Sequence, residues 1–278
     1  MIISESTLDQ KETGLRAIVR SLERCIVAFS GGIDSALVLK IATEELGDRA
    51  IGITGESASL AQREREGAAQ SAAAIGAQHE VLRTQELENE NYRSNPVDRC
   101  FYCKDELYGK LTAIARERGV QWILDGFNLD DAADYRPGRK AAAKFGVRSP
   151  LAEASFRKAD VRALARKLGV EIWDKPALAC LSSRVPYGTA ITLELLQQID
   201  AAERTVLAQG ISECRVRHHG DIARIEVPTH AMERLVAPGV REAIVAGVKA
   251  AGYRYVSLDL GGYVSGNLNF VLKGRSDG

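Results

Sequence analysis

Residues 25–35 read CIVAFSGGIDS, an apolar run followed directly by a serine, two glycines and an Ile-Asp-Ser string. CIVAF (25–29) is typical of a short buried strand and ALVLKIATEEL (36–46) of a helix, so the polar string lies between them. Glycines let the backbone approach an anion, and the free amides and dipole of a helix start bind it. The segment therefore predicts an anion-binding loop in which Ser30 and Ser35 add hydroxyl donors.

Two other interpretations of this loop explain less of it. A tight turn with Asp34 or Ser35 as the helix cap would account for the two glycines but not for the whole string. The Walker A pattern, G-x-x-x-x-G-K-[ST], requires a lysine that the segment lacks. The loop is therefore interpreted as a phosphate-binding loop of another type.

Strands alternate with helices around this loop. Apolar runs predict further strands over 50–54, 78–82 and 121–126, and helical spacing predicts helices over 7–23, 60–75, 100–118 and 159–168. This alternation favours an α/β fold with a parallel sheet covered on both faces. After an irregular stretch, 174–188, the pattern changes to a helix (192–209), a hairpin through Gly220-Asp221, a helix (239–251) and a strand (254–260). We therefore expect an α/β domain over 1–188 and a smaller α+β domain over 189–278.

The composition disfavours several classes of protein. Of the 278 residues, 45% are hydrophobic and 27% charged, proportions that support a globular core and argue against a disordered chain. Lys+Arg and Asp+Glu number 37 each, a balance that disfavours a nucleic-acid-binding protein. No apolar run approaches the ~20 residues that span a bilayer, and the first residues lack the features of a secretory signal. We therefore expect a cytoplasmic protein that does not enter the membrane.

The five cysteines favour metal binding or catalysis over a disulfide framework, because their number is odd and nothing indicates export. Cys25 and Cys214 fall in predicted strands, where a buried core role is expected. Cys180 differs from them, because it lies in the irregular stretch between Lys175 and Arg184, away from any apolar period.

Cys100 and Cys103 form a C-x-x-C motif at a predicted helix start, beside Arg99 and Lys104. Positive charge and a helix start both favour the reactive thiolate. One such motif supplies only two ligands, whereas a closed zinc site requires four and an iron–sulfur cluster usually takes four cysteines. The C-x-x-C pair by itself therefore completes neither kind of site.

Five segments in order resemble a known family. SGGIDS matches the SGGxDS loop of the PP-loop ATP pyrophosphatases. RCFYCK (99–104), GFNLDDAADYRPGRKAA (126–142), KPALACLSSRVPYG (175–188) and RVRHHGDIARIE (215–226) resemble the LarE family, the ATP-dependent sulfur transferases of nickel-pincer nucleotide cofactor synthesis. The resemblance runs over nearly the whole chain and implies a PP-loop ATP pyrophosphatase sheet in the first domain.

The resemblance implies an activity and its cofactors. ATP, normally with Mg²⁺, adenylylates a carboxylate of a pyridinium dicarboxylate mononucleotide, and sulfur transfer then gives a thiocarboxylate. The substrate is thus a small nucleotide, and a homo-oligomer is implied. The residues expected at ATP follow the first, second and fourth strands, at the sheet edge where open α/β sheets bind ligands: Ser30, Gly31, Gly32, Asp34, Ser35, Thr54 and Gly126.

Two routes for sulfur are implied by the same resemblance. In one, a single cysteine of the KPxxxCLxSR loop gives up its own sulfur and becomes dehydroalanine. In the other, two cysteines of a C-x-x-C join it to hold a [4Fe-4S] cluster with one open iron. Cys100, Cys103 and Cys180 are all present, which favours the cluster route and makes these cysteines the expected catalytic and iron-binding residues.

The second domain supplies the expected substrate residues. Arg215 and Arg217 share a strand face by period two, and paired guanidinium groups suit a phosphate, although a solvated face is the competing interpretation. The resemblance adds Ser183 and Arg184 as substrate residues. It also makes Glu226 a metal or substrate-orienting acid, against a salt bridge to Arg224 or Arg215.

Other features leave alternatives open. Asp130, Asp131 and Asp134 suit either a Mg²⁺ cluster or helix caps. Val264 follows Tyr263 where the family has an arginine, which puts the identity of the substrate in question. Transfer RNA thiolation predicts a basic surface that the balanced charge does not indicate, an amide-forming synthetase would not require the three cysteines, and the cysteines also disfavour a non-catalytic nucleotide-binding protein.

Overall fold

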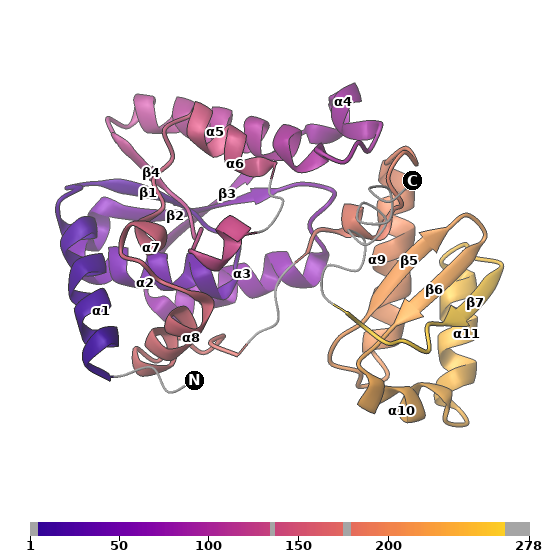
Figure 1. Ribbon diagram of the computed structural model, residues 1–278. Coiled ribbons are helices and arrows are strands. Elements are labelled where there is room, and N and C mark those ends of the chain that lie inside the picture. Colours follow the sequence, from indigo (N-terminus) through magenta and orange to yellow (C-terminus); the bar gives the residue numbers. More distant parts are fainter. Residues whose placement is uncertain (1–4, 134–136, 175–178, 265–278) are drawn as a thin grey trace, which may run out of the picture. The chain divides into compact units, whose positions relative to one another are not determined.

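The computed structural model describes residues 5–133, 137–174 and 179–264 (Figure 1). The chain forms two compact units, Met1–Tyr92 with Val97–Leu178, and Arg93–Pro96 with Ala179–Gly278. The sequence-based prediction separates two domains at residue 188, and the compact units of the structure separate at residue 178.

The first unit is built on a parallel sheet of four strands in the order β3-β2-β1-β4. Cys25 of β1 is in register with Ala50 of β2 and Trp122 of β4. The α/β fold with a parallel sheet, predicted from the alternating pattern, is confirmed. The strands are β1 (Cys25–Ala28), β2 (Ala50–Glu56), β3 (Gln78–Arg83) and β4 (Trp122–Leu124).

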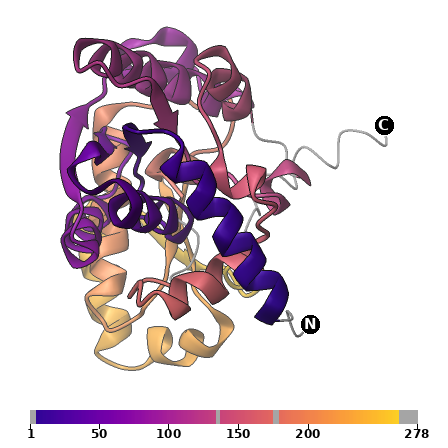
Figure 2. The same ribbon diagram turned by 90° about the vertical axis from the view of Figure 1, so that its left-hand side faces the viewer.

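Helices cover both faces of this sheet, because alternate residues of each buried strand point to opposite sides. Val27 packs in the core cluster that includes α1 and α2, whereas Ile26 and Ile53 pack in a second cluster with α5. Figures 1 and 2 show the two helical layers on either side of the sheet. One layer contains α1 (Glu5–Arg20), α2 (Ile33–Leu46), α3 (Gln62–Ile75) and α8 (Lys158–Lys167), and the other α5 (Arg99–Glu117) and α6 (Gly138–Lys144).

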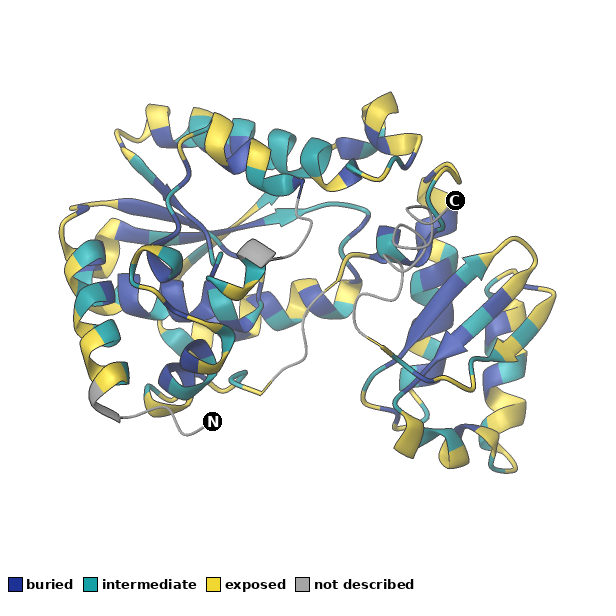
Figure 3. Cartoon of the chain, in the orientation of Figure 1, coloured by how far each residue is buried: buried dark blue, intermediate teal, exposed yellow. Residues whose placement is uncertain are grey.

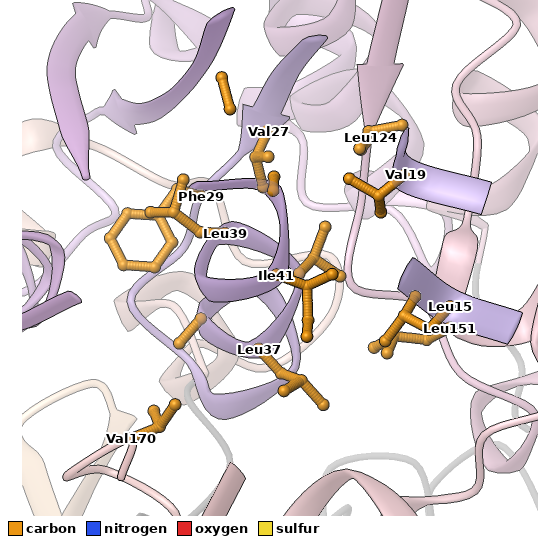
Figure 4. Packing of buried hydrophobic residues seen from close by; sticks show 14 of the residues in the cluster. Leu15, Val19, Val27, Phe29, Leu37, Leu39, Ile41, Leu124, Leu151 and Val170 are labelled. Carbon is orange, nitrogen blue, oxygen red and sulfur yellow. The ribbon is translucent and has the colours of Figure 1, made fainter. Parts of the chain in front are cut away.

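Helix α2 lies at the centre of the larger cluster and is buried on almost every side (Figure 3). Figure 4 shows Leu37, Leu39 and Ile41 of this helix among side chains of the sheet, of α1 and of later parts of the chain, which include Leu151 and Val170. A helix packed on all sides holds its first turn in a fixed position. The short elements of this unit are η1 (Gly47–Arg49), η2 (Glu86–Glu88), α4 (Glu90–Arg93), η3 (Asp130–Ala133) and α7 (Pro150–Glu153).

The second unit has a three-stranded sheet in the order β5-β6-β7 and its own hydrophobic core. Strands β5 and β6 are antiparallel and joined through Gly220, which has a φ of +61°, so the predicted hairpin is confirmed. Part of the stretch expected to be irregular forms the 3-10 helix η4. The elements are η4 (Leu181–Arg184), α9 (Leu193–Leu207), β5 (Arg215–His219), β6 (Ile222–Glu226), η5 (Thr229–Ala231), α10 (Met232–Val236), α11 (Val240–Ala250) and β7 (Tyr255–Leu258).

Residues 93–96, which are the last residue of α4 and part of the segment that leads to α5, belong to the second unit. The Asn95 side-chain amide donates to the carbonyl of Pro186 at 2.8 Å, and the amides of Gly188 and Ile191 donate to the carbonyls of Asn95 and Arg93. The chain therefore passes between the units three times, at residues 92/93, 96/97 and 178/179.

Candidate functional site

The SGGIDS loop is held by hydrogen bonds among its own residues. The Ser30 amide donates to the Ser35 hydroxyl at 3.1 Å, and this hydroxyl donates to the carbonyl of Gly32 at 3.0 Å. Helix α2 starts after Gly32, and the Ala36 amide donates to the Gly32 carbonyl. The amides of residues 33–35 precede this first helical hydrogen bond and have no acceptor within the helix, so they are available to bind an anion.

Close packing around the loop requires glycine at two positions. Gly31 has a φ of +72°, and a Cβ there would lie 2.8 Å from the Cβ of Ala68 on α3. Gly126 follows β4, and a Cβ there would lie 2.6 Å from the amide nitrogen of Ser35. The loop is thus enclosed by α3 on one side and by the end of β4 on the other, and neither neighbour leaves room for a side chain.

Asp34 contacts two side chains that are remote in sequence. The Asn128 side-chain amide donates to Asp34 Oδ1 at 3.2 Å, and Lys158 Nζ at the start of α8 lies 2.5 Å from Asp34 Oδ2. The Lys158 side chain keeps one third of its surface exposed. It therefore places a cation beside a phosphate loop whose own sequence contains none. Sequence analysis missed this lysine, because no local signal links residues that are 124 positions apart.

Thr54, expected on the adenosine side of ATP, has a buried side chain. Its hydroxyl donates to the carbonyl of Phe29 at 2.8 Å and lies 2.8 Å from Nε2 of His79. Burial lowers the pKa of His79 below its ordinary value. The structure places the Thr54 side chain in the packing between strands, and its role at ATP stays a prediction.

Acidic residues after β4 stabilise turns around the loop. Asp125 accepts from the Ser149 hydroxyl at 2.7 Å and from Arg139 at 3.1 Å, and Asp131 accepts from Asn128. Asp130 accepts from the backbone amide of Lys158 at 2.8 Å, so it fixes the start of the helix that carries the lysine. Asp134, the third member of the expected Mg²⁺ cluster, lies outside the described residues.

The C-x-x-C pair lies in the first turns of α5, as predicted. Cys100 is exposed and Cys103 is partly exposed. The Tyr108 phenol, and more weakly the thiols of Cys103 and Cys100, raise the pKa of Lys104 above its ordinary value. Lys104 thus adds a positive charge to the first turns of α5, which carry both thiols.

The remaining cysteines separate into buried and exposed ones. Cys25 and Cys214 are buried, as the sequence predicts for core residues, and burial raises the pKa of Cys25 to about 12. Cys180 is exposed at the N-terminal end of η4. The three cysteines predicted to be functional are thus the three whose surfaces reach solvent.

Arg184, which is predicted to bind substrate, is paired with a buried glutamate, and its role at the substrate stays a prediction. Its guanidinium forms two hydrogen bonds with the Glu203 carboxylate, at 2.8 and 3.0 Å, and both side chains are buried. Burial disfavours the charged guanidinium, but the Glu203 carboxylate outweighs this effect and raises the pKa of Arg184 above its ordinary value. The hydroxyl of the neighbouring Ser183 accepts a hydrogen bond from Arg184 Nη1 at 3.0 Å.

Arg215 and Arg217 are also buried, with different partners. Arg217 pairs with Glu226 at 2.8 Å, and Glu226 also pairs with Arg224 at 3.2 Å. The salt bridge proposed as the alternative role of Glu226 is therefore present, although Arg217 takes the place expected for Arg215. Arg215 lies over the Tyr263 ring, 4.8 Å from its centre. Its ion pair with the more exposed Glu213 is longer than the pair between Arg217 and Glu226, at 3.4 Å.

Comparison with known proteins finds relatives that match most of the chain. The asparagine synthase family model matches residues 15–118, which include the phosphate loop. An uncharacterized protein of Synechocystis sp. is 44% identical over 265 residues, 95% of this chain and 99% of the relative. The pyridinium-3,5-bisthiocarboxylic acid mononucleotide synthase of Lactiplantibacillus plantarum is 40% identical over 268 residues, 96% of each chain. The chain belongs to the LarE family. An uncharacterized protein of Methanocaldococcus jannaschii is 26% identical over 238 residues, 86% of this chain and 90% of the relative.

Membership of the LarE family confirms the resemblance found in the sequence and makes the protein an enzyme, an ATP-dependent sulfurtransferase. Among the described residues, no three His, Cys, Asp or Glu side chains form a group that could hold a metal ion. Within the same ranges, none of the helices has both the length and the apolar character of a membrane span. Of the predicted site residues, the structure brings Ser30, Gly31, Gly32, Asp34, Ser35 and Gly126 together around the start of α2.

Proposed function

We propose that the protein activates a carboxylate of a pyridinium dicarboxylate mononucleotide with ATP and converts it to a thiocarboxylate. The observation that carries this proposal is the match over 96% of both chains to a pyridinium-3,5-bisthiocarboxylic acid mononucleotide synthase. The phosphate loop and the three solvent-accessible cysteines supply the two chemical functions that such a reaction needs.

The activation step uses the loop at the start of α2. The amides of residues 33–35 bind the ATP phosphates, and Lys158 offsets the negative charge of Asp34 beside them. Mg²⁺ accompanies the nucleotide, with Asp34 as the nearest carboxylate of the loop. A carboxylate oxygen of the substrate attacks the α-phosphorus of ATP, the bond to the β-phosphate oxygen breaks, and pyrophosphate leaves. The product is an acyl adenylate, whose AMP group leaves when sulfur attacks the acyl carbon.

Sulfur supply is proposed to involve Cys100, Cys103 and Cys180 as ligands of one [4Fe-4S] cluster. The donor chemistry fits, since all three thiols reach solvent and Lys104 directly follows Cys103 in the chain. When bound, such a cluster supplies an iron without a protein ligand, which can carry a sulfide. The alternative source is Cys180 itself, which its exposed position in η4 would also allow.

Substrate recognition is proposed for the second unit, where Arg215 binds the phosphate of the mononucleotide. Arg217 and Arg184 are each neutralised by a buried glutamate. In the described part of the chain, Arg215 pairs with Glu213, whose carboxylate lies at 3.4 Å and is more exposed. A guanidinium that is stacked on a tyrosine ring and weakly paired can exchange its carboxylate for a phosphate. We also propose that this unit carries the contacts of a homo-oligomer.

Iron and labile-sulfide analysis of anaerobically purified protein tests the source of sulfur. Cys100→Ser, Cys103→Ser and Cys180→Ser should each lose the cluster and sulfur transfer, while ATP-dependent pyrophosphate release persists. The matched control is Cys25→Ala, a buried cysteine whose replacement should leave the iron content unchanged. Conversion of Cys180 to dehydroalanine in one turnover, with Cys100→Ser and Cys103→Ser still active, would establish Cys180 as the sulfur donor instead.

A further inference from the structure

We infer that Arg184 is a positioning residue, which fixes the backbone on either side of Cys180 for the sulfur step and does not bind substrate. The inference rests on the proposed function for the importance of Cys180. Its structural part concerns the cysteine turn, defined here as residues 179–184, and two buried arginine–glutamate pairs that hold it.

Arg184 connects the cysteine turn to helix α9. Two of its nitrogens donate to the two carboxylate oxygens of Glu203, and the two side chains are each only 2% exposed. The third nitrogen, Nη1, donates to the carbonyls of Ala179 at 2.8 Å and Cys180 at 3.0 Å. A planar guanidinium held by a bidentate carboxylate has one orientation. The two carbonyls on either side of the Cys180 α-carbon are therefore fixed relative to α9.

The other end of the cysteine turn is held in the same way. Arg217 Nη1 donates to the carbonyl of Ser183 at 2.9 Å, and Arg217 is itself bound to the fully buried Glu226. The Ser183 amide closes the turn by donating to the Cys180 carbonyl at 2.9 Å. The backbone around Cys180 is thus fixed at both ends while its thiol remains exposed.

Stability alone does not explain such pairs. A buried ion pair can often be replaced by apolar side chains without loss of stability, because the cost of removing both charges from water is then avoided. Apolar side chains could not, however, donate to the carbonyls of Ala179 and Cys180. The feature that only Arg184 supplies is therefore the fixed position of the turn, and a displacement of about 1 Å at a reacting group can lower a rate about 100-fold.

A double variant, Arg184→Met/Glu203→Gln, separates this role from folding. In the wild type, Glu203 Oε1 accepts a hydrogen bond from the Val216 amide at 3.0 Å. The side-chain oxygen of glutamine can accept the same hydrogen bond, and the double variant leaves no unpaired charge buried. Arg204→Met is the matched control, since Arg204 lies on the same helix and pairs with Asp200, but its own side chain is 56% exposed. We expect the double variant to fold and to release pyrophosphate at the wild-type rate. Its kcat for sulfur transfer should fall about 100-fold, with the KM for the mononucleotide within twofold of wild type.

Hydrogen exchange supplies a readout that does not require sulfur transfer. In the double variant the Ser183 amide should exchange at least tenfold faster, because its acceptor carbonyl is no longer held, whereas the Arg204→Met control should not change. If the proposed function failed, the wild type would transfer no sulfur, and the exchange rates would still test the clamp. Arg184→Lys, which keeps the charge but not the fork, should retain an intermediate kcat.

Three results would overturn the inference. A raised KM with an unchanged kcat in the double variant would make Arg184 a substrate-binding residue. Unchanged exchange at Ser183 would show that the turn does not depend on the pair. A wild-type kcat in Arg184→Lys would show that charge alone suffices and that the orientation of the guanidinium is irrelevant.

Discussion

Alanine at position 126 would test the phosphate loop by the addition of one methyl group. The new Cβ would lie 2.6 Å from the amide nitrogen of Ser35, closer than any stable contact allows. Gly126 is not among the residues with a positive φ, so the effect arises from this contact and not from backbone strain. The methyl group would cover an amide proposed to bind phosphate, or would displace the first turn of α2.

The expected size of the effect follows from one lost contact. A hydrogen bond from an amide to a phosphate contributes about 1.5–3 kcal/mol, so the Kd for ATP should rise about 10- to 150-fold. The forced contact should also lower the free energy of unfolding by about 1–3 kcal/mol. Isothermal titration with Mg²⁺ and ATP measures the first effect, and thermal unfolding measures the second.

The matched control is Gly109→Ala on α5. Its Cβ would lie 3.5 Å from the Phe145 ring, an ordinary contact, and alanine favours the helix interior by about 1 kcal/mol. This variant should bind ATP as the wild type does and unfold at the same temperature or above it. A folded Gly126→Ala protein with an ATP affinity within twofold of wild type would refute the placement of the phosphates on these amides.

Lys158→Met should weaken ATP binding about tenfold, because Asp34 would then face the phosphates without its cation; equal titration isotherms for variant and wild type would argue against this. Arg215→Met should weaken binding of the mononucleotide at least tenfold and leave ATP binding unchanged, and a parallel loss of both affinities would indicate a folding defect instead. Burial lowers the pKa of His79 from its ordinary value of 6.5. At a pH below 6.5 the unfolded chain therefore binds more protons at this residue than the folded chain does, and the free energy of unfolding falls as the pH falls. Denaturant unfolding at pH 7 and pH 5 should show a smaller drop for His79→Gln than for wild type, and identical drops would contradict the assignment.

Local patterns were sufficient to predict the strands, most helices and the phosphate loop, because each depends on residues close together in the chain. The predicted start of α2 is three residues late, because the helix begins inside the SGGIDS string, with Gly32 as its N-cap. Helix α6 (138–144) was missed because the Pro137-Gly138 pair, at its N-cap and first position, indicates a turn. Pairings between distant segments, such as Lys158 with Asp34, leave no periodic signal.

The partner of Arg184 did leave a signal in the sequence. In the predicted helix over 192–209, Leu196, Ile199, Glu203 and Val206 follow the spacing of the apolar face, and the structure buries all four. A glutamate at such a position requires a buried cation. The period-two argument for Arg215 and Arg217 likewise considered one strand alone, whereas the partner of Arg217 comes from the neighbouring strand of the hairpin.

The three passages of the chain between the two compact units have a consequence for folding during synthesis. Asn95 and Val185, whose amide and carbonyl meet in the second unit, are separated by 90 residues. A ribosome that adds about 5–20 residues per second needs roughly 5–20 s to make this distance. The first unit can therefore complete its sheet through β4 while residues 93–96 still await the segment that binds them. The second unit then folds around residues 93–96, whose neighbours in the chain on both sides already belong to the folded first unit. The order of translation therefore sets the order of assembly.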